Sequence, residues 1–304
     1  MKIILLVFIA ISLSAQLINF DIKPKSMKSN KIMNIKILDS VKLKFDELNG
    51  IEFNEISALA YKKNKLYALS NKGYLHQLDI KIRKNKISRL TLKKSMTLKK
   101  KNKNRLKKKH RDAEGMVLIG DELYISFERK ARVNIFSLNG VKLRKHKISK
   151  ELRFMGNYQT KNKALESIAY NEKYGILVAP EQPLIGSDED LHVIYAKDTT
   201  YSFTASSLLS AMEFIDKDRL LTLERSFNQL TRKRVIILKE VNLNKVKNNI
   251  AESKVLAVLD SSKGWNIDNF EGLAKVGKNK FLMISDDNRG FFQNTLLVLF
   301  KIID

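Results

Sequence analysis

The 304-residue chain contains no cysteine and only three prolines. The lack of cysteine excludes disulfide bonds, a lipid anchor on cysteine, a thiolate metal site and a cysteine nucleophile. The scarcity of proline means that no proline-rich linker divides the chain, which favours a single domain. Beyond the first fifteen residues, no apolar run approaches the length needed to span a bilayer.

The amino-terminal segment has the pattern of a secretory signal peptide. A short basic start precedes an unbroken apolar run over residues 3–11, and small residues follow up to Ala15. The apolar run is too short for a permanent transmembrane helix. We therefore predict a cleaved signal peptide at residues 1–15, a mature domain at 16–304 and a periplasmic or secreted location. An uncleaved membrane anchor is the alternative.

Acidic residues are scarce compared with basic ones. The chain has 32 Asp and Glu against 57 Lys and Arg, for a formal charge of +25. Residues 93–111 alone hold eleven Lys or Arg and no acid. We predict a solvated basic loop here, with weak contact to an anionic membrane surface or steering of phosphate as the alternative. The run lacks the interleaved aromatics of a nucleic-acid platform, and export also argues against a nucleic-acid partner.

The chain does contain one pattern that occurs five times. Each copy has an acid or serine before small apolar residues, an apolar strand, a turn, and a second strand that ends near an acid. The copies occupy residues 55–70, 112–129, 164–181, 209–225 and 269–287. Their starts lie about 45 to 60 residues apart, the spacing of propeller blades. Further strand signals follow each copy, and Asn139-Gly140 between two of them is a strong hairpin signal.

These units predict an all-β fold, namely a β-propeller with five blades of four antiparallel strands. The fifth unit lacks one strand, and we expect the strand at residues 35–45 to complete it and close the ring. Six blades is the alternative, if residues 85–111 or 243–268 hold another unit. A β-sandwich is disfavoured because the repeats stay in phase. We expect a monomer.

Familiar catalytic motifs are missing from the sequence. The four histidines show no metal-ligand spacing, and there is no GxSxG elbow, P-loop or dinucleotide fingerprint. Ser57 and Ser210 occupy repeat positions where other copies have acids, which makes them candidate nucleophiles. No histidine lies in an obvious partner position, so the acids are the stronger candidates.

Acids recur in phase at two positions of the repeat. The first position carries Ser57, Glu114, Glu166, Ser210 and Glu271, and the second carries Asn71, Glu128, Glu181, Glu224 and Asp286. Because the first strand of each blade lines the central channel, these carboxylates should converge and repel one another. A hard cation such as calcium would relieve the repulsion. The predicted metal ligands are Asp112, Glu114, Glu128, Glu166, Glu181, Glu224, Glu271, Asp286 and Asp287.

The acids are distributed unevenly among the repeats. The second, third and fifth copies carry acids at both positions, so we expect the metal to lie off the axis towards them. The alternative is that these acids form ion pairs with neighbouring bases, such as Arg129 and Arg225. Gly115 and Gly272 directly follow two acids, where a glycine lets the backbone approach an ion or turn tightly.

The segments that carry these acids resemble the family called esterase-like activity of phytase. The matching motifs are DAEG (112–115), SFER (126–129), ALE (164–166), LERSF (223–227), NFEGLA (269–274) and SDDN (285–288). They occur in order over nearly the whole mature chain. The resemblance implies a propeller with phosphoesterase or phytase-like activity, and its acids carried over are Asp112, Glu114, Glu128, Glu166, Glu224, Glu271, Asp286 and Asp287. The first repeat departs from the pattern at Ser57 and Asn71.

We therefore predict an exported, calcium-dependent phosphoesterase that hydrolyses a small-molecule phosphate ester. Glu114 or Glu271 would act as the general base. Arg129, Arg225 or Arg289 would hold the phosphate. The alternative is a non-catalytic propeller of the cell envelope that binds a ligand or partner, with calcium serving stability only.

Overall fold

The computed structural model of the protein describes residues 13–160, 162–288 and 293–303. Its regular structure is almost entirely β-strand, and the predicted all-β class is confirmed. The helical elements of the described residues are α1 (Lys150–Arg153), η1 (Lys108–His110), η2 (Met155–Asn157) and η3 (Ser261–Lys263). None of these is long and apolar enough to cross a membrane. Most of the predicted signal peptide lies outside the described residues.

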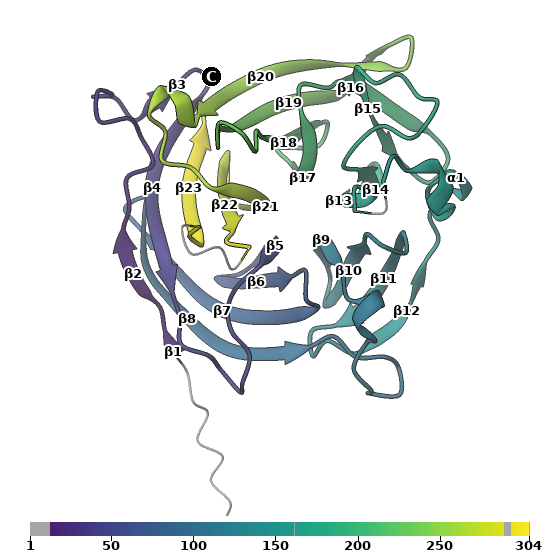
Figure 1. Ribbon diagram of the computed structural model, residues 1–304, viewed down its shortest axis with the longest axis horizontal. Coiled ribbons are helices and arrows are strands. Elements are labelled where there is room, and N and C mark those ends of the chain that lie inside the picture. The colour runs from purple at the N-terminus through teal and green to yellow at the C-terminus, as the bar shows by residue number, and fades with distance from the viewer. Residues whose placement is uncertain (1–12, 161, 289–292, 304) are drawn as a thin grey trace, which may run out of the picture.

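The first four repeats each form four strands, which lie side by side in chain order from the middle of the molecule outward (Figure 1). The first forms β5 (Ile56–Lys62), β6 (Lys65–Ser70), β7 (Tyr74–Arg83) and β8 (Lys86–Thr97). The second forms β9 (Ala113–Ile119), β10 (Glu122–Phe127), β11 (Arg132–Ser137) and β12 (Lys142–His146). The third forms β13 (Leu165–Asn171), β14 (Gly175–Pro180), β15 (Leu191–Tyr195) and β16 (Thr200–Thr204). The fourth forms β17 (Leu208–Phe214), β18 (Arg219–Phe227), β19 (Arg234–Lys247) and β20 (Ile250–Asp260).

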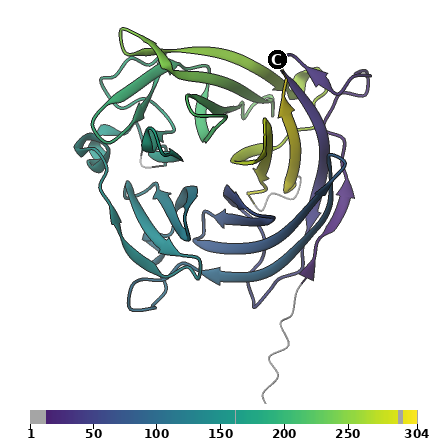
Figure 2. The same cartoon turned by 180° about the vertical axis from the view of Figure 1, so that it is seen from behind.

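The last repeat is completed by a strand from the other end of the chain. It forms β21 (Asn269–Gly277), β22 (Lys280–Asp286) and β23 (Leu296–Ile302). Strand β4 (Ile35–Lys44) pairs antiparallel with β23, so the strand expected at 35–45 is present beside the last repeat, as Figure 2 also shows. The remaining strands are β1 (Leu13–Ser14), which pairs with β8, and β2 (Gln16–Asn19) and β3 (Lys31–Ile32), which pair with β4.

The innermost strand of each repeat lies around a common centre (Figure 1). Strands β5, β9, β13, β17 and β21 each contact the next, and β21 returns to β5. The sheets radiate from this ring, which makes the fold propeller-like. One residue pair, Ser202 with Ile250, joins the outer strands of the third and fourth repeats into a single hydrogen-bonded sheet. The central hollow is lined by all five inner strands, and its volume of about 10 Å³ leaves room for little more than one water molecule.

The hydrophobic core lies between neighbouring sheets. Leu59 and Leu90 of the first repeat, for example, belong to one buried cluster with Leu282 and Leu299 of the last. Each sheet therefore buries its apolar side chains against the next sheet, and this packing fixes the inner strands around the ring.

Two expectations about the outer strands need correction. The predicted basic loop at 93–111 begins inside β8, because residues up to Thr97 pair with β7. The stretch 243–268 lengthens the hairpin of β19 and β20 and ends after η3. Neither stretch, within the described residues, holds a further four-stranded sheet, so the alternative of six blades gains no support.

Candidate active site

Each inner strand is interrupted by a β-bulge at the first repeat position. In the third repeat, Leu165 pairs with Pro180 and Ser167 pairs with Ala179, which leaves Glu166 without a partner across the strands. The same shift occurs in all five repeats, at Ser57, Glu114, Glu166, Ser210 and Glu271. A bulge bends its strand and redirects the extra side chain. The sequence repeat therefore marks a repeated backbone feature.

Gly115 and Gly272 follow two of the bulged acids for a steric reason. A Cβ atom at Gly115 would lie 2.6 Å from the carbonyl oxygen of Glu166 in the next inner strand, and one at Gly272 would lie 3.1 Å from the backbone of Ala58. Neighbouring inner strands can approach this closely only where the side chain is absent. The two glycines thereby bring acids of adjacent repeats together.

The second repeat position comes six residues after the start of the second strand. Counted in this way, its residues are Asn71, Glu128, Glu181, Arg225 and Asp286. The assignment of Glu224 to this position is therefore wrong by one residue. Strand pairing agrees, since Leu209 before the bulge pairs with Glu224, whereas Leu208 pairs with Arg225. A slip of one residue turns a side chain to the opposite face of the strand.

Glu224 faces the space between the third and fourth repeats and does not join the other acids. Its side chain is fully buried, with Lys239 Nζ 2.8 Å from its Oε1. The backbone amides of Ser206 and Ser207 donate to its Oε2 at 2.7 and 2.8 Å. Burial works to raise the pKa of Glu224, but His192 and Lys239 outweigh it and lower the pKa below the ordinary value. The residue forms a buried ion pair between repeats.

Arg225 points into the centre and is surrounded by carboxylates. Its Nη2 lies 3.0 Å from Glu181 Oε1, 3.2 Å from Glu271 Oε1 and 3.7 Å from Glu166 Oε1. Its Nη1 donates to Asn269 Oδ1 at 2.9 Å. Burial opposes the charged form, but the surrounding carboxylates raise the pKa of Arg225 above its ordinary value. One guanidinium thus compensates three acids.

In the described part of the chain, no Lys or Arg forms an ion pair with Glu114 or Glu128 of the second repeat in this way. One oxygen each of Asp112, Glu114 and Glu128 lies within 4.8 Å of the others. Arg129 Nε lies 2.5 Å from Asp112 Oδ2 at the exposed edge of the group. Among the described residues, none donates a hydrogen bond to the Glu114 carboxylate, although that side chain is buried. We call Asp112, Glu114 and Glu128 the acid triad.

The triad belongs to a wider set of acids, all buried except the partly exposed Asp112. We call this set the acid ring; it consists of Asp112, Glu114, Glu128, Glu166, Glu181, Glu271 and Asp286. Burial and then the charges of Glu128 and Glu271 raise the pKa of Glu114 well above its usual range. Burial, followed by Asp112 and Glu181, raises the pKa of Glu128 to about 8. Burial and then Glu271 raise the pKa of Asp286 to about 8. The carboxylates are thus close enough to hinder one another's ionisation.

The acid triad fits the ligand preferences of calcium. All three donors are carboxylate oxygens, the hard ligands that calcium takes. Two oxygens that bind one calcium ion at about 2.4 Å can be at most about 4.8 Å apart, and the triad oxygens lie within this limit. No donor among the described residues hydrogen-bonds to the buried Glu114 carboxylate to stabilise its charge.

Residues 51–289, most of the chain, match the protein family described as Phytase-like: Esterase-like activity of phytase. The chain belongs to this family. The resemblance to this family that the short motifs indicated is therefore confirmed. No curated protein matches the chain.

Several solved structures are similar to this member of the phytase-like family. Glutaminyl cyclase from Myxococcus xanthus is 11% identical, with 83% of this chain and 92% of that chain covered and a TM-score of 0.46. YCF48 from Cyanidioschyzon merolae is 9% identical, with 92% and 98% covered and a TM-score of 0.42. A chain of the mitotic checkpoint complex is 11% identical, with 87% and 69% covered and a TM-score of 0.40.

The two serines at bulge positions connect inner strands of this phytase-like chain. Ser57 Oγ donates to the carbonyl oxygen of Ala113 at 2.7 Å. Ser210 Oγ lies 3.4 Å from the carbonyl oxygen of Phe270 and 3.2 Å from that of Leu223. Both hydroxyls are buried and engaged with backbone carbonyls. These contacts are typical of structural serines, and neither hydroxyl forms a hydrogen bond to a side-chain base among the described residues.

Two further acids connect the last repeat to the first. Asp287, a predicted ligand, accepts hydrogen bonds from Glu55 N at 3.1 Å and Thr295 Oγ1 at 2.8 Å; it is not part of the acid triad. Glu55 is a buried residue that sequence reasoning missed. Its carbonyl oxygen accepts Asn71 N at 3.0 Å, just as Asp112 O accepts Glu128 N at 3.0 Å. Glu55 therefore holds the place of Asp112 in the first repeat, two residues before the bulge.

The predicted phosphate-binding arginines differ in their surroundings. The Arg129 side chain is 55% exposed beside Asp112, so it can reach a ligand from solution. Arg225 is enclosed by the acid ring. Arg289 lies outside the described residues.

Proposed function

We propose that this protein is an exported hydrolase of phosphate esters that binds a divalent cation, calcium, at the acid triad. One observation carries the proposal: the triad is a group of carboxylates, two of them buried, and no Lys or Arg among the described residues lies at its centre. Membership of a phytase-like family supports phosphate-ester hydrolysis as the reaction class.

The acid triad residues would hold the cation. Asp112 lies before the bulge of β9, Glu114 at the bulge, and Glu128 directly after β10. Of the five repeats, only the second has acids at all three of these positions, and all the residues compared are described. Bound there, calcium would supply positive charge to the phosphoryl oxygens of a substrate.

The remaining acids and Arg129 would provide substrate contact and proton transfer. Arg129 would donate its planar fork of N–H groups to the phosphate oxygens. Glu271 would accept a proton from the attacking water, while the water oxygen bonds to phosphorus and the ester P–O bond breaks. The leaving alkoxide takes up a proton from solvent and departs as an alcohol, and Glu271 releases its proton to solvent. Arg225 supports this role, since it opposes the burial that raises the pKa of Glu271.

The substrate would bind at the mouth of the central hollow. A hollow of about 10 Å³ is too small to admit a phosphate ester. The acid triad and Arg129 lie where the second strand of the repeat ends, which is the edge of the ring. We therefore expect a substrate whose phosphate reaches this edge while the rest of it remains outside.

We further propose that the ring has five blades, the last completed by β4. Five bulges, five inner strands in contact around the centre and the pairing of β4 with β23 support this number. The sheet joined through Ser202 and Ile250 would then be two blades that touch at their outer edges.

Binding of a ligand without catalysis is the competing function. The engagement of both candidate nucleophiles, Ser57 and Ser210, with backbone carbonyls favours it. In that case, the cation would stabilise the ring and the ligand would bind at the same edge.

Hydrolysis of phosphate esters tests the proposal. Purified protein is assayed on phosphomonoesters, phosphodiesters and inositol phosphates, with calcium and with a chelator. We expect turnover with calcium only, and a loss of about 100-fold or more for Glu271→Gln. Glu122→Gln, an exposed acid of the second repeat, is the matched control and should retain activity. If no substrate in the panel is turned over while calcium still raises the melting temperature, the competing function holds.

A further inference from the structure

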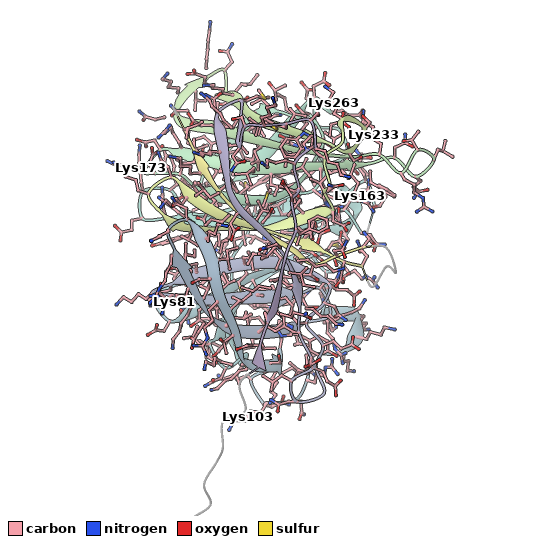
Figure 3. The ribbon with its side chains drawn as sticks, turned by 90° about the vertical axis from the view of Figure 1, so that its left-hand side faces the viewer. Lys81, Lys103, Lys163, Lys173, Lys233 and Lys263 are labelled. Carbon is pink, nitrogen blue, oxygen red and sulfur yellow. The ribbon has the colours of Figure 1, made fainter. Side chains whose placement is uncertain are left out.

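A groove rich in basic side chains lies on the first repeat. Its lining comes from the turn between β5 and β6 and from the outer hairpin of β7 and β8. In Figure 3, Lys81 of this groove lies on one side of the molecule, whereas Lys163, two residues before β13, and Lys233, between β18 and β19, lie on the opposite side. Those two lysines belong to connections at the end where the acid ring lies. The groove is therefore separate from the candidate active site.

Unequal strand lengths create the groove. Strand β6 begins at Lys65, and the turn before it is tied to β7 by a hydrogen bond from Ile80 N to Asn64 O. Beyond this point, β7 and β8 continue without β6 as far as their own turn. The inward face of this hairpin is apolar, and Ile80 and Leu90 belong to the core cluster with β4. The outward face of the hairpin remains open, and the turn between β5 and β6 forms one side of the groove.

The open face is strongly basic. Six basic side chains line the groove with a single acid, namely Lys63, Lys65, Lys81, Arg83, Arg89 and Lys93 with Asp79. Lys93 Nζ lies 3.7 Å from Asp79 Oδ2. Within the part of the chain that the structure describes, no ion pair involves the other five bases. The groove thus presents five uncompensated positive charges.

The arrangement of these bases works against stability. Lys81 lies directly opposite Arg89 on the adjacent strand, and Arg83 lies opposite Lys86. Like charges at facing positions of a sheet destabilise it. An excess of basic side chains is not a general property of the surface hollows of this protein. The hollow beside the β13–β14 turn has three acids and three bases in its lining, namely Glu172, Glu213, Asp216, Lys173, Lys217 and Lys275.

We propose that this groove binds a linear polyanion that carries phosphate or sulfate groups. Successive exposed bases on β7 are two residues, or about 7 Å, apart, and the bases of β8 lie about 5 Å across. Such rows match a chain of anionic groups better than a single ion. Arginine provides paired donors for each oxyanion.

The composition of the lining argues against other anionic partners. It contains no aromatic residue, whereas single-stranded nucleic acids need rings on which bases stack. Its two large apolar residues, Ile80 and Ile82, are buried and half-buried, whereas insertion into a lipid surface needs exposed apolar side chains. A flexible polyanion without stacking or apolar groups fits both observations.

Binding of polyphosphate and heparin to the whole protein tests the proposal. The affinity is measured by fluorescence anisotropy over a range of salt concentrations. Lys81→Glu, Arg83→Glu and Arg89→Glu are combined in a groove variant. Lys101→Glu, Lys103→Glu and Lys107→Glu, exposed lysines of the basic run outside the groove, form a control with the same change in net charge. We expect the groove variant to bind at least about tenfold more weakly and with a flatter salt dependence. The control should bind nearly as the unchanged protein does.

Several results would overturn the proposal. Equal weakening by both variants would mean that net charge alone attracts the polymer. Unchanged binding by the groove variant would place the polymer elsewhere. Binding to vesicles that contain phosphatidylglycerol, with none to polyphosphate or heparin, would identify a lipid surface as the partner. A second groove variant, with glutamine at all three positions, guards against misfolding; it should melt at or above the temperature of the unchanged protein, because the facing like charges are removed, and still bind more weakly.

Discussion

At the scale of single residues, Arg225 determines which acids of the ring are left uncompensated. Its Nη2 lies within 3.7 Å of carboxylate oxygens from the third and fifth repeats. The acids of the second repeat, Asp112, Glu114 and Glu128, are left with Arg129 at their exposed edge. The ring thus has one half that a protein cation neutralises and one half that suits a bound cation.

Removal of the Arg225 charge should expose the repulsion between the acids it contacts. We expect Arg225→Met to lower the free energy of unfolding by about 3–5 kcal/mol near pH 8, since a buried pair loses one partner. The loss should be smaller near pH 5. A buried acid with a raised folded-state pKa contributes to the free energy of unfolding at low pH. This contribution is lost as the pH rises through that pKa. Urea unfolding at both pH values measures this.

Arg144→Met is the matched control, because Arg144 pairs with Glu122 on the exposed surface. It should change stability little at either pH. An equal loss for Arg225→Met at both pH values would contradict the assigned role and indicate that only packing was lost.

Residue-level expectations succeeded where the repeat was regular. Glu114, Glu166 and Glu271 were assigned to a shared position, and each proves to be a bulge residue. Glu224 was misassigned because the pair Glu224-Arg225 resembles Glu128-Arg129. Counting six residues from the strand start gives Arg225. No sequence motif shows which face a strand residue takes after a bulge, since one extra residue reverses it.

At the scale of strands, close approach of neighbouring inner strands holds the acid ring together. Glycine permits this approach at Gly115 and Gly272. Hydrogen bonds from the hydroxyls of Ser57 and Ser210 to backbone carbonyl oxygens connect further neighbours around the ring. Strand order was predictable from periodicity and turn signals, because each repeat alternates apolar strands with short turns. The extension of β8 into the basic run was not, because lysines on its open face carry no strand signal.

A methyl group at Gly115 should separate β9 from β13. We expect Gly115→Ala to destabilise the protein by about 1–3 kcal/mol, since the added Cβ would lie 2.6 Å from Glu166 O. Gly277→Ala is the control, because the nearest atoms there are 3.8 Å away. Thermal melting of both variants measures the difference. A Gly115→Ala protein as stable as the Gly277→Ala protein would refute close strand contact at this position.

At the scale of the whole molecule, positive and negative charges are separated, with bases on the outer strands and acids at the centre. The chain carries a formal charge of +25, yet its centre concentrates buried acids. Lysines and arginines on the outer strands form the basic groove, and the acid triad lies at the opposite side. A positive surface would attract phosphate esters from solution towards the molecule. The acid triad would repel them unless a cation is bound, so substrate binding and cation binding should be coupled.

The proposed function requires that the acid triad binds one divalent cation. Calorimetric titration of chelator-treated protein with calcium tests it most directly, near the pH of about 8 at which Glu128 ionises. We predict one calcium ion bound per chain, no binding by Glu114→Gln, and unchanged binding by Glu122→Gln. Binding that persists in Glu114→Gln, or no binding by the unchanged protein, would contradict the account.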